Sequence, residues 1–174
     1  VTAGVLSVKE VGDFWEEIAL IRKLQGTVLN SFDAWLLIRG MRTLFLRVER
    51  CSQNAMAVAK HFHGHHYLET VLYPVLSSDP GHEVAKKQTN GQFGGMMSII
   101  IKGSEQTAVD VTRFCQLFYP ATSLGGVESL IEHRKTVSGE GFPVHPRLLR
   151  LSIGIEDADD LIWDLEQALT RAFN

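Results

Sequence analysis

The sequence predicts an α/β protein whose second half is a small α+β domain. Three observations support this prediction. Helix-period and strand-like segments alternate along the chain, a long helical segment covers residues 33–62, and a strongly amphipathic helix follows residue 157. Because the strand-like segments of the second half are few and separated by helices, we expect an antiparallel sheet with helices on one face.

The first half reads as a strand followed by helices. Residues 3–8 form a short apolar strand-like segment, and apolar residues recur at helical spacing over residues 11–21. Residues 26–31 contain helix breakers. A continuous apolar stripe over residues 33–62, interrupted only by Gly40, then predicts one long helix that could bend at the glycine.

The second half contains three strand-like segments, at residues 67–73, 93–102 and 148–155. Between the first two lies a loop with a short helix over residues 77–90. Ser104 is placed to cap a helix running to Phe118, and residues 135–146 read as a loop. Asp157 opens the last helix, whose first turn is acidic as the helix dipole favours.

Composition excludes several classes of protein. The chain has 17 basic and 20 acidic residues without a basic cluster, which argues against nucleic acid or an anionic membrane surface as a partner. The apolar run over residues 96–101 is too short to cross a bilayer. Two cysteines make no disulfide framework, so we expect a reducing, cytoplasmic location. Val1 is not an initiator methionine, and we expect the chain to be part of something longer.

Most candidate sites have simple structural explanations. A run of four histidines resembles a metal cluster, but it lacks a cysteine or carboxylate at ligand spacing and fits a surface loop better: His61, His63, His65 and His66. His82, His133 and His145 have no nucleophile paired with them in sequence. The glycine pairs at 94–95 and 125–126 fit tight turns as well as a phosphate cradle. We therefore predict no metal site here.

Arg150 is different, because it stands inside an otherwise apolar strand. Burying a guanidinium without a partner costs several kcal/mol, so an anion is expected beside it. From the physics alone, a structural carboxylate such as Glu128 or Glu156 and a substrate carboxylate are about equally good candidates.

Five segments in order resemble one enzyme family. They are FDAWLLIRGMRTLFLRVERCSQNAMAVA, YPVLSSDPGHEVAKKQ, GQFGGMMSI, SLGGVESLI and LLRLSIGIEDADDLIWDLEQAL, and together they extend over nearly the whole chain. They resemble the cystathionine γ-synthase, γ-lyase and β-lyase family of enzymes that depend on pyridoxal 5'-phosphate (PLP). The resemblance implies the C-terminal part of PLP-transferase fold type I. Residues 1–60 would then be the tail of the large PLP-binding domain and a long linking helix, and residues 61–174 the small substrate-binding domain.

The resemblance also assigns roles to three residues. It implies that Arg150 binds the substrate α-carboxylate and that Ser123 assists it. Thr122 occupies a position where many γ-synthases and γ-lyases carry a glutamate, which leaves recognition of the distal end of the substrate open. After SLIEH the sequence departs from the family pattern through a shorter segment, RKTVSGEGFPVHPR. The exact reaction, β- or γ-elimination or γ-replacement, therefore stays open.

Family chemistry requires a lysine that carries PLP as a Schiff base, and none of the lysines here stands in the family's Ser-x-Thr-Lys context. We expect no catalytic or cofactor-binding residue in this chain, and no activity without an N-terminal half. Three hypotheses remain: part of a homotetrameric, cytoplasmic transsulfuration enzyme, which we favour; a stand-alone module that binds an amino-acid carboxylate; or a structural pseudo-subunit. The apolar Phe14, Trp15, Trp35 and Leu36 on the first helices argue against self-sufficiency.

Overall fold

The computed structural model describes residues 3–123, 125–139 and 141–174. Leu124 of the SLGG motif and Glu140 of the predicted loop lie outside the described residues. The chain divides into two compact units, Val1–Phe45 and Leu46–Asn174. The boundary that we predict at residue 60 remains a prediction about domains of the intact protein.

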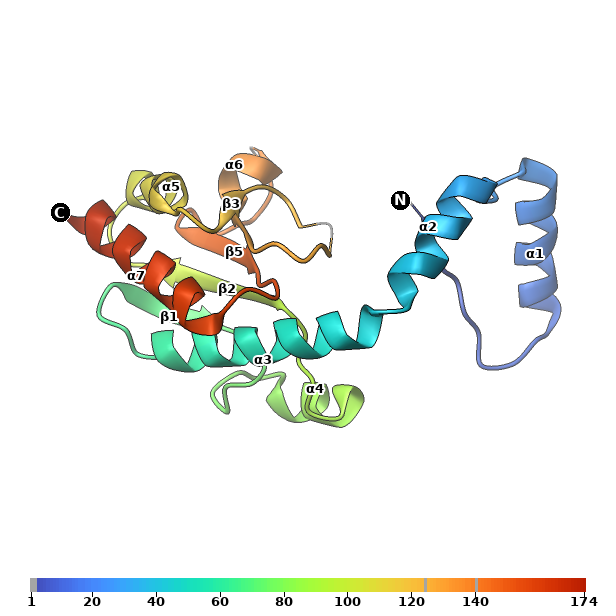
Figure 1. The fold of residues 1–174 in the computed structure, drawn as a ribbon, viewed down its shortest axis with the longest axis horizontal. Coiled ribbons are helices and arrows are strands. Elements are labelled where there is room, and N and C mark those ends of the chain that lie inside the picture. The colour runs from blue at the N-terminus through green and yellow to red at the C-terminus, as the bar shows by residue number, and fades with distance from the viewer. Residues whose placement is uncertain (1–2, 124, 140) are drawn as a thin grey trace. The chain divides into compact units, whose positions relative to one another are not determined.

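The described residues of the first unit contain two complete helices, the first two residues of a third, and no strand. Helix α1 is Asp13–Gln25 and helix α2 is Ser31–Met41 (Figure 1). The strand predicted at residues 3–8 is wrong, because that segment is extended but has no neighbouring strand to bond to, and Val5 is 85% exposed. Residues 26–30 do break the helix as predicted, and the Asn30 side chain accepts a hydrogen bond from the Asp33 amide at 2.9 Å.

The long helical segment is divided rather than merely bent. Helix α2 ends at Met41 and helix α3, Leu44–Phe62, begins after a two-residue turn. The Arg42 amide bonds to the Gly40 carbonyl, which tightens the last turn. Glycine has a low helix propensity, so the helical backbone is interrupted near Gly40. The apolar stripe in the sequence nevertheless continues on both sides of this break.

The second unit is built on a five-stranded sheet of order β1-β2-β5-β4-β3. The strands are β1 Leu68–Leu72, β2 Met96–Ile101, β3 Tyr119–Pro120, β4 Leu130–His133 and β5 Leu148–Ser152. Neighbours pair antiparallel except β3 and β4, which are parallel. The sheet is therefore mixed rather than purely antiparallel. Strand β4 was not predicted, because all four of its residues are buried and its short sequence shows no polar alternation.

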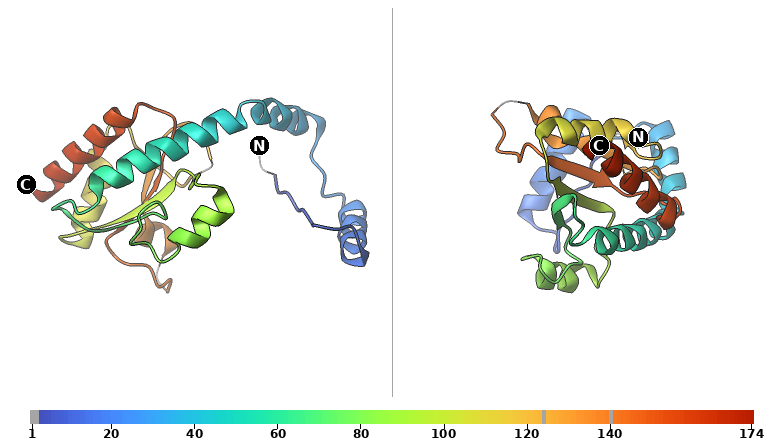
Figure 2. Two further views of the ribbon diagram at one scale, coloured as in Figure 1. Left: turned by 90° about the horizontal axis from the view of Figure 1, so that it is seen from below. Right: turned by 90° about the vertical axis from the view of Figure 1, so that its left-hand side faces the viewer.

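Three helices cover one face of this sheet. They are α3, α5 (Glu105–Phe114) and α7 (Ala158–Phe173), and α5 packs along α7. Figure 2 shows α3 and α7 on the same side of the sheet. The main contributors to the core are Val58, Phe62, Ile99, Ile101, Val111, Ile131, Leu149, Leu151, Leu161, Leu165 and Leu169. Short helices α4 (His82–Thr89) and α6 (Arg134–Ser138) contribute no fully buried residue.

Helix α5 ends four residues before the predicted end, and a buried carboxylate explains why. Asp164 of α7 is fully buried and accepts the amide hydrogens of Gln116, Leu117 and Phe118 at 2.7, 2.8 and 3.0 Å. These amides would otherwise have to bond within a continued helix. The carboxylate instead stabilises an extended turn that leads the chain into β3.

We expect Asp164→Asn to lower the free energy of unfolding by about 2–3 kcal/mol, because an NH₂ group would face amide donors in a buried site. Chemical denaturation of both variants measures this. Asp160→Asn is the matched control, since Asp160 is exposed on the same helix, and it should cost less than about 1 kcal/mol. Equal losses in the two variants would contradict a special role for Asp164.

Candidate functional site

Strand β5 presents two kinds of side chain on its two faces. Leu149 and Leu151 are fully buried in the core beneath the helices. Arg150 and Ser152 point to the opposite face because side chains alternate along a strand. Arg150 is opposite Ser98 of β2 and Glu132 of β4 in the sheet register. The predicted arginine therefore lies in the middle of the face that the three helices leave open.

Glu132 is the acidic partner of Arg150. Its Oε1 atom lies 3.0 Å from Arg150 Nε, and its side chain is only 3% exposed, compared with 27% for Arg150. Arg134 adds a second guanidinium, whose Nη1 donates to the same Oε1 at 2.8 Å. Two arginines thus share one buried carboxylate, which leaves one positive charge uncompensated among the three groups. That excess favours an additional anion at this face.

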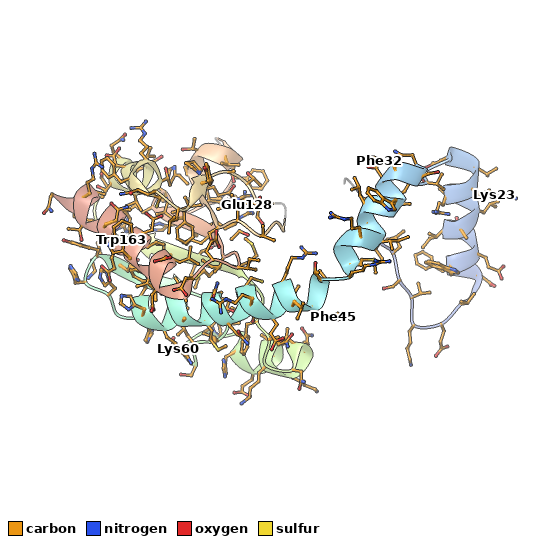
Figure 3. All side chains as sticks on the ribbon, viewed as in Figure 1. Lys23, Phe32, Phe45, Lys60, Glu128 and Trp163 are labelled. Carbon is orange, nitrogen blue, oxygen red and sulfur yellow. The ribbon has the colours of Figure 1, made fainter. Side chains whose placement is uncertain are left out.

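Neither of the two carboxylates that we predicted as structural partners contacts Arg150. The Glu128 side chain accepts a hydrogen bond from the Val127 amide at 3.1 Å, in the loop before β4 (Figure 3). Glu156 accepts hydrogen bonds from the Ser129 amide at 2.6 Å and the Ser129 hydroxyl at 2.9 Å. Sequence reasoning missed Glu132 because its pairing with Arg150 depends on the register of two strands.

The Glu156 contacts belong to a buried network that fixes the chain around the site. Ser129 Oγ accepts a hydrogen bond from the Gly154 amide at 2.8 Å. Asn54 of α3, which is 2% exposed, donates through Nδ2 to the carbonyls of Gly154 and Glu156 at 3.0 and 2.7 Å. A Cβ at Gly154 would overlap the Val127 carbonyl oxygen, so a glycine is required there. The loop before β4 is thereby tied to the end of β5.

Ser123 reaches the same face as Arg150. Its hydroxyl lies 2.8 Å from the Ser152 hydroxyl, and it accepts a hydrogen bond from the Gly125 amide at 3.3 Å. Ser152 is two residues after Arg150 on β5, so the two serines and the arginine lie together. Ser152 is a candidate that the sequence alone did not single out. The roles predicted for Arg150 and Ser123 remain predictions.

Thr122 has its hydroxyl donor occupied within the chain. It donates to Glu132 Oε2 at 2.7 Å, so it supports the carboxylate that holds Arg150. Thr122 and Glu132 also line a hollow of about 280 Å³ between α5, β3, β4 and α6, together with Pro120 and Val137. The structure thus places all three predicted site residues, Arg150, Ser123 and Thr122, around one part of the sheet.

Lysine and cysteine side chains are the groups that could anchor a cofactor covalently. None of the seven lysines is buried in the described structure, and Figure 3 shows Lys23 on α1 and Lys60 on α3 projecting outward. Lys102 donates to the His66 carbonyl at 2.8 Å. Burial raises the pKa of the Cys115 thiol, and Asp164 raises it further, so this cysteine is not activated as a nucleophile. At Arg150, Ser123 and Ser152 the site offers a guanidinium and two hydroxyl groups, which suit binding of an anion.

The histidine-rich segment forms a carboxylate-bridged pair. His61 Nε2 and His65 Nε2 lie 2.8 and 3.3 Å from the two oxygens of Glu166 on α7. A carboxylate absent from the local sequence is thus supplied from far along the chain. Among the described residues, no three His, Cys, Asp or Glu side chains are grouped so as to hold a metal ion. Likewise, no helix in the described part of the chain is long and apolar enough to span a membrane.

A family model described as Cys/Met metabolism PLP-dependent enzyme matches residues 1–170. The chain is 46% identical over 159 residues to cystathionine gamma-synthase of Mycobacterium tuberculosis H37Rv, covering 88% of this chain and 41% of that protein. It is 42% identical over 173 residues to cystathionine gamma-lyase of Bacillus subtilis, covering 95% of this chain and 44% of that protein.

The chain is also similar to solved structures. The structure of metB from Corynebacterium glutamicum superposes with a TM-score of 0.84 at 41% identity, over 91% of this chain and 42% of that one. Cystathionine gamma synthase from Xanthomonas oryzae pv. oryzae, in complex with aminoacrylate and cysteine, gives a TM-score of 0.85 at 35% identity, over 94% and 44%. The chain spans about two fifths of the length of these relatives.

The histidine pair predicts how stability depends on pH. Burial lowers the pKa of His65, and this outweighs the attraction of Glu166, while His66 and His61 lower it further. Folding therefore favours neutral His65, and this contribution to stability is lost as the pH falls below about 6.5 toward the lowered pKa. We expect His65→Gln to flatten the fall in unfolding free energy between pH 7 and 5. His63→Gln, at an exposed position of the same segment, is the matched control for the substitution itself; identical slopes in both variants would contradict the assignment.

Proposed function

Because this chain belongs to the Cys/Met metabolism PLP-dependent enzymes, we propose that it is the C-terminal, substrate-binding portion of a cystathionine gamma-synthase-like enzyme. The intact protein would carry out β- or γ-elimination or γ-replacement on a cysteine- or homoserine-derived amino acid. The lysine that carries PLP would lie outside this chain, and this chain alone would be inactive. We further propose a cytoplasmic homo-oligomer, with a homotetramer as the expected state.

The observation that carries the proposal is the guanidinium of Arg150 on the open face of the sheet. Its Nε faces Glu132, and its Nη groups make no hydrogen bond to a described residue. A planar guanidinium presents paired N–H donors that match the two oxygens of a carboxylate. Ser123 and Ser152 place hydroxyl groups on the same face.

Together these groups would bind and orient the substrate. Arg150 would hold the α-carboxylate through two parallel hydrogen bonds, and Ser123 would add a hydroxyl contact. Each charge-assisted hydrogen bond is worth about 1.5–3 kcal/mol. Thr122, whose hydroxyl already donates to Glu132, would contribute through its position beside the hollow. PLP, when bound, supplies an electron sink for bond cleavage next to that carboxylate.

Exposed apolar side chains on the first unit support association with further polypeptide. Phe32 and Phe45, which are labelled in Figure 3, are 65% and 84% exposed, and Trp35 is 56% exposed. Phe14 on α1 is 71% exposed. The Phe32 and Trp35 rings are neighbours, with centroids 5.9 Å apart. Contiguous exposed apolar surface is uncommon on self-sufficient monomers and is typical of surfaces that another domain or subunit covers.

One observation keeps a second candidate open. Every side chain of the proposed carboxylate site lies in the second unit, which has its own core. A stand-alone module that binds amino-acid carboxylates is therefore the alternative. The exposed apolar residues of the first unit favour the enzyme portion over this module, and over a purely structural subunit.

A chimera tests the proposal. This chain would replace the corresponding C-terminal segment of the Mycobacterium tuberculosis cystathionine gamma-synthase, whose name gives the expected reaction class. We expect the chimera to bind PLP, shown by visible absorbance, and to form an α-keto acid from an amino acid with a γ leaving group. The 174-residue chain mixed with PLP should do neither. Turnover by the chain alone would overturn the proposed division of labour.

In the chimera, Arg150→Ala should raise KM for the amino-acid substrate by at least about tenfold, because both charge-assisted hydrogen bonds to the carboxylate are lost. Steady-state kinetics measure the change. Arg147→Ala is the matched control: this arginine pairs with Glu69 at 2.7 Å, and its loss should leave KM within about twofold of the unsubstituted value. An unchanged KM in Arg150→Ala would favour a purely structural ion pair.

A further inference from the structure

We propose that Glu132 is a positioning residue that sets the orientation of the Arg150 guanidinium for the substrate carboxylate. This inference rests on the proposed function of Arg150. The two residues are directly opposite each other on antiparallel strands β4 and β5. Their side chains lie on the same face of the sheet, where such cross-strand neighbours are close enough to interact.

Glu132 lies at one particular edge of the Arg150 guanidinium. Glu132 Oε1 lies 3.0 Å from Nε of Arg150, which is the inner nitrogen of the guanidinium. A guanidinium has a side edge, formed by Nε and one Nη, and an outer edge, formed by both Nη atoms. Because the carboxylate of Glu132 lies by the inner nitrogen, the outer edge remains available to a second carboxylate.

Glu132 is itself held in place from two further directions. The Thr122 hydroxyl donates to Oε2 at 2.7 Å, and Arg134 Nη1 donates to Oε1 at 2.8 Å. The Glu132 side chain is 3% exposed, so water does not compete strongly for its oxygens. A buried carboxylate bonded to both neighbours has little freedom to rotate, and it transmits this rigidity to Arg150.

The net charge of the site also favours a positioning role for Glu132 over a role that only neutralises Arg150. A lone Glu132–Arg150 pair would cancel the positive charge that an anionic substrate requires. Arg134 restores it, since two guanidiniums share the one carboxylate. Glu132 can therefore orient Arg150 without abolishing the attraction of the site for a carboxylate.

The test uses the PLP-loaded chimera and L-norvaline, an amino acid whose side chain carries no leaving group. The dissociation constant is read from the change in the visible absorbance of the bound cofactor, so no turnover is needed. We expect Glu132→Gln to raise this constant about tenfold, since the amide keeps the shape but loses the charge that orients Arg150. KM for a reactive substrate should rise in parallel, with a smaller change in kcat.

Two further variants separate positioning from a structural role. Glu69→Gln removes the acidic partner of Arg147 in the same sheet, and it should leave the norvaline affinity unchanged. Thr122→Val keeps the shape of the side chain but removes the hydroxyl that holds Glu132, and we expect a loss of about threefold. This milder variant keeps the test decisive if Glu132→Gln does not fold.

The outcomes distinguish the inference from the proposed function. Unchanged norvaline affinity in Glu132→Gln or, if that variant does not fold, in Thr122→Val would overturn the positioning role alone. An equal loss in Glu69→Gln would also overturn it, because the effect would then be general to ion pairs of the sheet. Failure of the unsubstituted, PLP-loaded chimera to bind norvaline would overturn the proposed carboxylate site itself.

Discussion

The two-residue period of β5 is the constraint on which the rest of the second unit depends. One five-residue strand supplies Leu149 and Leu151 to the core and Arg150 and Ser152 to the open face. Its pairing with β2 and β4 fixes which residues are opposite Arg150. A slip of one residue in that register would turn the arginine into the helix-covered core and the leucines toward solvent. The hydrophobic core therefore enforces the geometry of the polar face.

The hydrogen-bond network at the end of β5 extends this control to the loop that carries Ser123. Asn54, Ser129 and Glu156 tie helix α3, the start of β4 and the chain after β5 to one another. Gly154 allows the close approach of the Val127 carbonyl that this arrangement requires. The glycine and the two acidic residues near it are thus explained by backbone packing, and Arg150 takes its partner elsewhere.

The sequence predicted the helices and strands whose formation depends on neighbouring residues in the chain. The helix after Asp157 and the strand containing Arg150 follow from periodicity and capping, and an arginine in an apolar strand predicted a neighbouring anion, which Glu132 provides. The resemblance to one family supplied Ser123 and Thr122. The early end of α5 and the pairing of Arg150 with Glu132 could not be predicted, because each depends on a side chain brought from a distant part of the chain. The strand predicted at residues 3–8 was wrong for a related reason. A strand needs a neighbouring strand to pair with, and local sequence patterns do not show whether one is present.

The two units differ in how completely they bury their own apolar side chains. The second unit buries its own core and assembles a guanidinium, hydroxyls and a carboxylate on one face of its sheet. The first unit leaves large apolar side chains such as Phe32 and Phe45 exposed. Exposed apolar surface costs free energy in water unless another surface covers it, whereas a polar site requires only that its own strands stay in register. The groups that we propose to bind a carboxylate thus all lie in the second unit, and the exposed apolar side chains of the first unit support the proposed association with further polypeptide.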